Sequence, residues 1–194
     1  MSCEDDIIKM QLENASDTIS ESDYGTHTLI VYPNLDILRE FYSYYVKKRV
    51  EEKNEVSQLA PFYETEDSVR KSLSEGEISI DIEKWEKEEK SLIIVDSLKK
   101  SSEHDSPESD NNFNKNLVES AKTMGKAGVS ILTDTGAFPF KHREEDLVNY
   151  ELALPSKYDI DLKRVCLYHQ KDFDKLSEEQ KLKLLDHHEF AIKI

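Results

Sequence analysis

Five histidine and cysteine side chains stand at or near the ends of predicted strands and helices. His27 opens the apolar run HTLIVY, Cys166 and His169 belong to RVCLYH, and His187 and His188 end a predicted helix. Because strand and helix ends meet at one edge of an α/β sheet, these side chains could converge. Imidazole and thiolate groups suit zinc and similar ions, but no pair has the Cys-x-x-Cys spacing of a structural site. A metal site, a ligand pocket and a structural role all remain open.

Cys166 has neighbours that disfavour a catalytic role. A reactive thiol needs an electropositive and partly exposed setting. Cys166 stands instead between Val165 and Leu167 in an apolar strand, where a free cysteine is typically a small core residue. We therefore assign no catalytic residue to the chain.

Two aspartates, Asp96 and Asp134, end the further apolar runs SLIIVD and GVSILTD. Carboxylates at neighbouring strand tips have the right chemistry for magnesium. They define one alternative function, a metal- or nucleotide-dependent hydrolase that uses both side chains.

The first strand-to-helix turn, residues 32–36, lacks the features of a phosphate-binding loop. Such a loop needs several glycines, a lysine and a Ser or Thr, and the sequence YPNLD has none of them. Pro33 removes a backbone donor, and Asp36 places negative charge where a phosphate would lie. We expect no conventional ATP hydrolysis, no cofactor and no resident metal.

Short apolar runs alternate with helical patterns along the rest of the chain. Strands are predicted at 27–32, 56–63, 91–96, 129–133, 164–169 and 189–194, with helices between them. Asn34 and the Ser177-Gln180 pair are predicted to cap two of these helices. The alternation predicts an α/β fold, a three-layer sandwich with a mostly parallel central sheet whose centre holds HTLIVY, SLIIVD and GVSILTD.

Two polar stretches interrupt this pattern. Residues 1–23 carry seven acidic side chains and one lysine, which predicts an acidic disordered tail before a domain over 24–194. Residues 99–112, KKSSEHDSPESDNN, show no periodicity and are predicted to form a long polar loop.

The formal net charge of −15 disfavours nucleic acid and anionic membrane surfaces as partners. The chain also shows no signal peptide and no apolar run of transmembrane length. Its two cysteines, Cys3 and Cys166, stand near opposite ends of the sequence, which fits a reducing compartment. We expect a soluble, cytoplasmic protein.

The last third of the chain carries the most specific pattern. A Tyr150-Glu151 pair in a helix is followed by a strand with Cys166-x-Tyr168, then Phe173, then a helix that ends in His187. This order, together with the lead-in Gly25-Thr26-His27 and the SLIIVD strand, resembles the MEDS domain, the sensory domain of methanogens and methylotrophs typified by the DcmR regulator. The resemblance covers roughly residues 24–194.

MEDS domains resemble RecA and KaiC ATPases in fold but lack the phosphate-binding loop. The resemblance therefore implies a RecA/KaiC-like, non-enzymatic sensory domain that binds a small organic ligand or a partner protein. His27, Cys166 and His187 would line its pocket, and we add Tyr32 and Asp96 from the carboxyl edge of the sheet. The chain carries no kinase, receiver or helix-turn-helix, so a kinase or transcription regulator would act as output in trans. A KaiC-like structural adaptor, built as a homo-oligomer, is a further alternative.

Overall fold

A computed structural model describes residues 3–103, 106–140 and 144–194. Its strands are β1 (His27–Tyr32), β2 (Val56–Ala60), β3 (Leu92–Ile94), β4 (Val129–Asp134), β5 (Leu162–His169) and β6 (Phe190–Lys193). The α-helices are α1 (Cys3–Glu21), α2 (Leu35–Lys47), α3 (Glu66–Glu75), α4 (Ser97–Glu103), α5 (Pro107–Thr123), α6 (Ala137–Phe140), α7 (Glu144–Ala153), α8 (Gln170–Phe173) and α9 (Glu178–His187). Two π-helical segments, η1 (Lys48–Glu52) and η2 (Glu83–Glu88), complete the described secondary structure.

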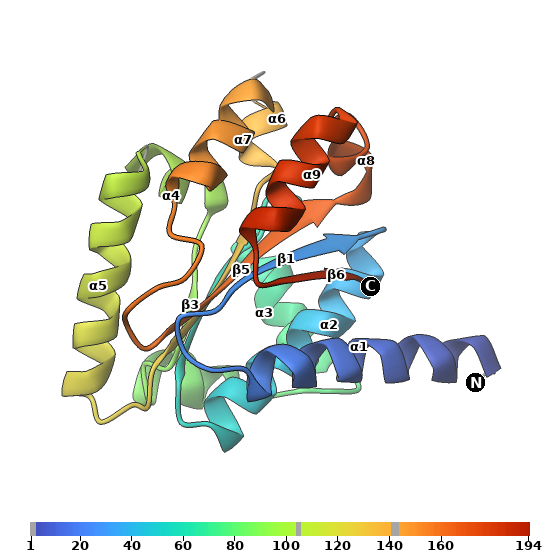
Figure 1. The fold of residues 1–194 in the computed structure, drawn as a ribbon. Helices are drawn as coiled ribbons and strands as arrows, with labels where there is room; N and C mark the ends of the chain where they lie inside the picture. Colours follow the sequence, from blue (N-terminus) through green and yellow to red (C-terminus); the bar gives the residue numbers. More distant parts are fainter. Residues whose placement is uncertain (1–2, 104–105, 141–143) are drawn as a thin grey trace.

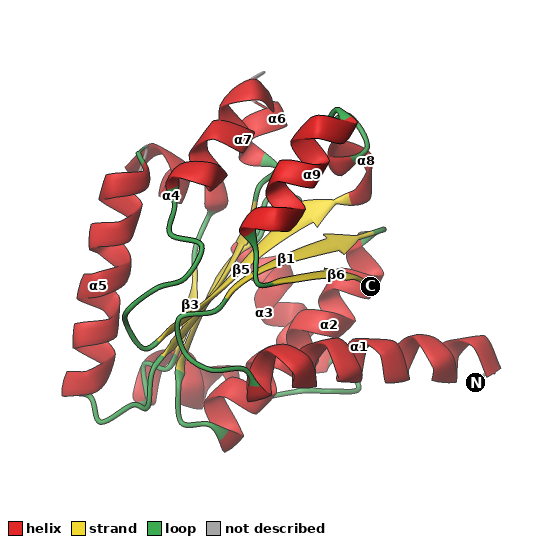
Figure 2. Ribbon diagram, in the orientation of Figure 1, coloured by secondary structure: helices red, strands yellow, loops and turns green. Residues whose placement is uncertain are grey.

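Within the described residues, one six-stranded sheet has the order β3-β2-β4-β5-β1-β6, and every pairing in it is parallel (Figures 1 and 2). Helices lie on both sides of the sheet, which confirms the predicted three-layer α/β sandwich. The predicted central place of SLIIVD is wrong, because β3 is a three-residue edge strand. The centre is occupied by the longer buried strands β4 and β5.

Alternate side chains of each strand enter two separate helical layers. Ile30 and Tyr32 of β1 pack in a core with α1, α2 and α3. Leu29 and Val31 face the opposite way and pack in a core with α7 and α9, and α5 covers β2 and β4 on this same side. This alternation decides which side chains of β1 and β5 can meet.

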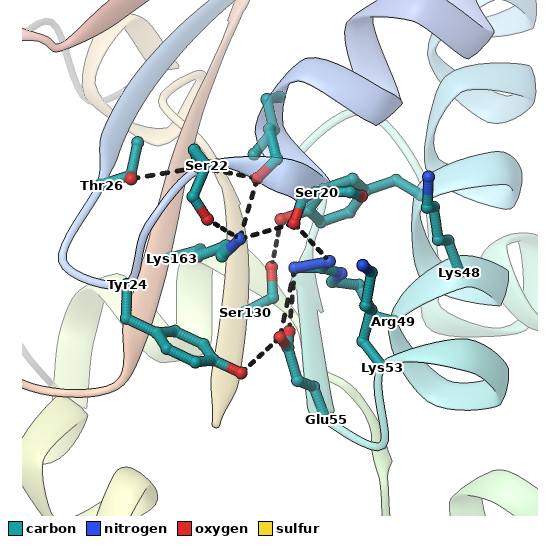
Figure 3. A network of polar contacts seen from close by, with 12 residues as sticks. Ser20, Ser22, Tyr24, Thr26, Lys48, Arg49, Lys53, Glu55, Ser130 and Lys163 are labelled. Atoms are coloured by element: carbon teal, nitrogen blue, oxygen red, sulfur yellow. Dashed lines mark hydrogen bonds and ion pairs between the residues drawn. The ribbon is translucent and has the colours of Figure 1, made fainter. Parts of the chain in front are cut away.

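The prediction of a disordered tail over residues 1–23 is wrong for residues 3–21, which form helix α1, while residues 1 and 2 lie outside the described part. Helix α1 buries Leu12, Ala15 and Ile19 at helical spacing, and it packs against α2. The carbonyl of Ser20, in its last turn, accepts hydrogen bonds from Lys163 Nζ at 2.7 Å and from Arg49 Nη2 at 3.1 Å (Figure 3). These partners lie far away in the sequence, so the acidic composition concealed a docked helix.

The prediction of a long polar loop over 99–112 is also wrong. Helix α4 runs to Glu103 and α5 begins at Pro107, while residues 104 and 105 lie outside the described part. Ser106 is the N-cap of α5, since its hydroxyl accepts a hydrogen bond from the Ser109 amide at 3.2 Å. The local signal was the Ser-Pro pair, because proline is favoured at the first helical position.

Both predicted helix caps are confirmed. Asn34 accepts hydrogen bonds from the first amides of α2, and Ser177 and Gln180 form a reciprocal capping box at α9. Among the described residues, no helix combines the length and the apolar character needed to cross a bilayer.

Candidate functional site

Four buried side chains with metal-ligand chemistry converge between the sheet and the layer of α7 and α9. They are His27, Glu151, Cys166 and His188, and one ligand atom from each lies within 4.8 Å of all the others. Their exposed fractions are 0%, 2%, 1% and 6%. We call this group the HECH cluster.

The sheet register places His27 and Cys166 together. His27 is the first residue of β1 and pairs with Arg164, while Cys166 pairs with Leu29 two positions further along. Because side chains alternate along a strand, all four of these residues face the α5, α7 and α9 layer. The two adjacent parallel strands thus bring the imidazole and the thiol together without help from a loop.

The other two members come from the helical layer. Glu151 lies in α7, and His188 is the C-cap residue of α9, two positions before β6 begins at Phe190. Helices α7 and α9 pack against each other over the sheet (Figure 1). Four segments that are distant in sequence therefore meet at one buried point.

The interatomic distances within the HECH cluster are short. His27 Nε2 lies 3.3 Å from Cys166 Sγ and 3.7 Å from Glu151 Oε2. His188 Nε2 lies 3.5 Å from the same carboxylate oxygen. The two imidazole rings are tilted against each other, with centroids 4.2 Å apart.

Backbone carbonyls fix the tautomer of both histidines. His27 Nδ1 lies 3.0 Å from the Pro155 carbonyl, and His188 Nδ1 lies 2.7 Å from the Leu184 carbonyl. A carbonyl only accepts, so each Nδ1 must carry the proton, and each Nε2 of a neutral ring presents a lone pair to the cluster. His188 Nε2 and Glu151 Oε2 have no hydrogen-bond partner, although both atoms are buried.

Electrostatics favour a neutral His27 beside a charged Glu151. Burial, together with the neighbouring His188, lowers the pKa of His27 to about 3. Burial acts to raise the pKa of Glu151, yet the neighbouring His188 and the nearby Arg164 charge hold it below its usual value. Burial and the Glu151 charge raise the pKa of the Cys166 thiol. Without a bound cation the cluster therefore contains a neutral His27 imidazole, a carboxylate and a thiol beside the imidazole of His188.

A buried ion pair stands next to the cluster on the same face of β5. Arg164 Nη1 donates to Asp110 Oδ2 of α5, and each residue is 2% exposed. The guanidinium also acts electrostatically on Glu151 and Cys166. It supplies a fixed positive charge near the HECH cluster without joining it.

The arrangement is poorly suited to cysteine catalysis. An activating histidine needs its second nitrogen held by an orienting group and its thiol exposed to substrate. Here His27 Nδ1 is held by the Pro155 carbonyl, and Cys166 is buried with a raised thiol pKa. The histidine is thus oriented, but the burial and the raised pKa of the thiol oppose formation of a nucleophilic thiolate.

The five residues singled out from the sequence lie in three places. His27 and Cys166 belong to the HECH cluster, and the His187 ring centroid lies 5.8 Å from that of His27. His187 Nε2 instead bonds to the Leu154 carbonyl at 3.0 Å. Tyr32 lies at the opposite end of β1 on the other face, and Asp96 is an exposed residue at the sheet edge.

The predicted neighbouring positions of Asp96 and Asp134 are wrong, because β2 lies between β3 and β4. Asp134 accepts hydrogen bonds from the Tyr32 hydroxyl at 2.5 Å and the Gly136 amide at 2.8 Å. Asp96 Oδ1 accepts from the Lys99 amide at 2.8 Å, in the first turn of α4. The two carboxylates thus have separate structural partners.

The turn after β1 is closed by its own side chain. Asn34 Oδ1 accepts from the amides of Asp36 and Ile37 at 3.0 and 3.1 Å. These are amides that a phosphate would use at a helix N-terminus. The turn therefore satisfies its donors without an anion.

Sequence reasoning named all members of the cluster except Glu151 as residues that could converge. Glu151 appeared only as part of the Tyr150-Glu151 pattern, and nothing in its spacing marks it as a buried acid. His188 was passed over for His187, since adjacent histidines at a helix end cannot be ranked by periodicity. His169 lies at the far end of β5 and caps α8.

No protein-family model, no curated protein and no solved structure matches this chain.

Proposed function

We propose that this chain is a non-enzymatic sensory domain that binds its signal at the HECH cluster and acts through a separate output protein. The observation that carries this proposal is the buried convergence of His188 Nε2 and Glu151 Oε2, which have no hydrogen-bond partner. Unpaired buried acceptors destabilise a fold, so a ligand that satisfies them gains binding free energy from that site.

The cluster is placed so that an occupant would link two layers of the fold. Its members belong to β1, β5 and α7 and to the junction of α9 with β6. His188 directly precedes Glu189, whose amide bonds to the His27 carbonyl at 2.9 Å, and then β6 at the edge of the sheet. Binding at His188 would therefore order the edge strand and α9 together, which gives the signal a route to the surface.

The resemblance to MEDS domains supports the same class of function. It implies a RecA/KaiC-like sensory domain, with a kinase or a transcription regulator receiving the signal in trans. It also implies a small organic ligand near His27, Cys166 and His187, and the first two of these belong to the cluster. A KaiC-like adaptor remains the alternative, distinguished by stable assembly of an empty chain.

The test is native mass spectrometry of the protein purified from its own cells without added ligand, combined with hydrogen exchange. We expect a reproducible added mass in the wild type that is lost in Cys166→Ser. Removal of the bound species should speed amide exchange in α7, α9 and β6. An empty wild-type chain, or a bound species whose removal leaves exchange in these elements unchanged, would refute the sensory role.

A further inference from the structure

We infer that the HECH cluster is a closed, four-coordinate site for a divalent transition-metal ion of the zinc class. Its ligands are His27 Nε2, Glu151 Oε2, Cys166 Sγ and His188 Nε2. The inference does not depend on the sensory role, because a metal held in this position could serve structure alone. It assigns a resident ion, one of the three roles left open for these side chains, to a chain that was expected to hold none.

The spacing of the four atoms fits a tetrahedral ion. Bonds from zinc of about 2.0–2.1 Å to nitrogen or oxygen and about 2.3 Å to sulfur give ligand–ligand edges of roughly 3.3–3.7 Å. The distances from His27 Nε2 to Cys166 Sγ and to Glu151 Oε2 are 3.3 and 3.7 Å, and that from His188 Nε2 to Glu151 Oε2 is 3.5 Å. Every other pair is within 4.8 Å, so small side-chain movements would complete the site.

The surroundings of the histidines are those of metal ligands. A metal-bound histidine almost always donates its other ring N–H to a carbonyl or carboxylate, which fixes its orientation. The carbonyls of Pro155 and Leu184 accept from His27 and His188 in this way. Both Nε2 atoms are thereby held toward the same point, and the carboxylate oxygen there lacks a donor.

Charge balance selects a dication. On binding, the S–H bond of Cys166 breaks, a metal–sulfur bond forms, and the proton leaves to solvent. The thiolate and the Glu151 carboxylate then carry two negative charges, which a divalent ion neutralises in a buried site. Nitrogen and sulfur ligands disfavour magnesium and calcium, which require oxygen ligands.

One metal-free arrangement competes with this inference. If His188 carried protons on both ring nitrogens, it would form a buried ion pair with Glu151, and Cys166 would donate its S–H to His27. This arrangement satisfies the same atoms with one additional proton. It predicts no specific affinity for transition metals.

Cobalt titration of the reduced, chelator-treated protein separates the two arrangements. The wild type is expected to bind one equivalent of Co²⁺ with the visible bands of a tetrahedral ion and a thiolate-to-cobalt charge-transfer band, and Zn²⁺ should displace it. Cys166→Ser should lose the charge-transfer band. Glu151→Gln, which is nearly isosteric, should weaken metal affinity by at least about tenfold.

His187→Gln is the matched control, since His187 neighbours His188 but bonds the Leu154 carbonyl instead of the cluster. It should retain the wild-type spectrum and stoichiometry, and circular dichroism should show that every variant is folded. The absence of a charge-transfer band in the wild type would overturn the inference. So would a loss of metal affinity in His187→Gln as large as that in Glu151→Gln, or a cobalt spectrum and affinity that Cys166→Ser leaves unchanged.

This outcome can be separated from that of the sensory role. A bound metal whose removal leaves hydrogen exchange of α7, α9 and β6 unchanged supports the site and contradicts the sensor. An added mass that depends on the cluster and belongs to an organic molecule supports the sensor and contradicts the metal site.

Discussion

Strand β5 carries buried polar side chains on both faces, and the two groups differ in how their atoms are paired. Lys163 faces the layer of α1 and α2, while Cys166 faces that of α7 and α9. Each group contains a buried glutamate, Glu55 on the first face and Glu151 on the second, and both are 2% exposed. Only the first glutamate has a fixed cation as its partner.

The group around Lys163 places each charged group beside a partner of opposite charge or polarity (Figure 3), although Arg49 Nε and Glu55 Oε2 make no hydrogen bond of their own within the described residues. Lys163 Nζ donates to the carbonyls of Ile19, Ser20 and Ser22 at the end of α1. Arg49 Nη1 lies 3.1 Å from Glu55 Oε2, and the Tyr24 hydroxyl donates to Glu55 Oε1 at 2.6 Å. This network holds a helix against the sheet.

The HECH cluster instead brings acceptors together. Two imidazole nitrogens and a carboxylate oxygen converge, and the thiol of Cys166 is the one group of the four that carries a proton at its ligand atom. Burial and polarity alone therefore do not identify a binding site. The balance between donors and acceptors does, because an excess of acceptors calls for a cation.

The largest effect is expected from Lys163→Met on the matched face. The variant leaves three carbonyls at the end of α1 without their donor, which should lower the free energy of unfolding by about 4 kcal/mol. Urea unfolding gives the loss, and hydrogen exchange should show that α1 opens first.

Lys48→Met is the control for this variant. Lys48 pairs with Asp17 of α1 at 2.6 Å, but Asp17 is largely exposed, so the loss should stay within about 1 kcal/mol. Equal losses in the two variants would mean that the buried carbonyl contacts do not anchor the helix.

Asp134 is a third buried carboxylate, and it accepts hydrogen bonds from neutral donors without a neighbouring cation among the described residues. Burial raises the pKa of Asp134 to about 6 despite the hydrogen bonds from Tyr32 and Gly136. The folded state thus holds this proton more tightly than the unfolded state. The stabilisation is complete below the ordinary aspartate pKa and is lost as the pH rises through about 6.

Asp134→Asn should remove this pH-dependent contribution to the free energy of unfolding. Relative to the wild type, the variant should gain about 3 kcal/mol of unfolding free energy between about pH 4 and about pH 7. Urea unfolding at both pH values measures the gain. A difference that does not vary with pH would show that Asp134 keeps an ordinary pKa in the folded protein.

Local patterns predicted the parts of the fold that are determined locally. The strands β1 and β5, the Asn34 cap and the Ser177-Gln180 capping box depend on residues within a few positions of one another, and each was predicted correctly. Helix α1 was missed because the donors that hold its end, Lys163 and Arg49, are supplied by other elements.

The candidate site was predictable only in part for the same reason. His27 and Cys166 were singled out because strands β1 and β5 are evident from the sequence. Glu151 was missed because its burial depends on how α7 packs against α9, which periodicity within α7 does not reveal. Asp96 was included because a strand-end aspartate looks the same at the edge of a sheet as at its centre.

The smallest and most discriminating effect is expected from the same substitution at the two buried glutamates in metal-free protein. Glu55→Gln removes the charge facing Arg49 and should cost about 2 kcal/mol. Glu151→Gln adds N–H donors where acceptors converge, so it should raise the free energy of unfolding by about 1 kcal/mol. With zinc present, Glu151→Gln should instead lower the free energy of unfolding, because the wild type gains more free energy from binding the ion. Equal losses of unfolding free energy in Glu151→Gln and Glu55→Gln without metal would contradict this expectation. They would mean that His188 Nε2 carries a proton, so that each buried glutamate is paired with a cation.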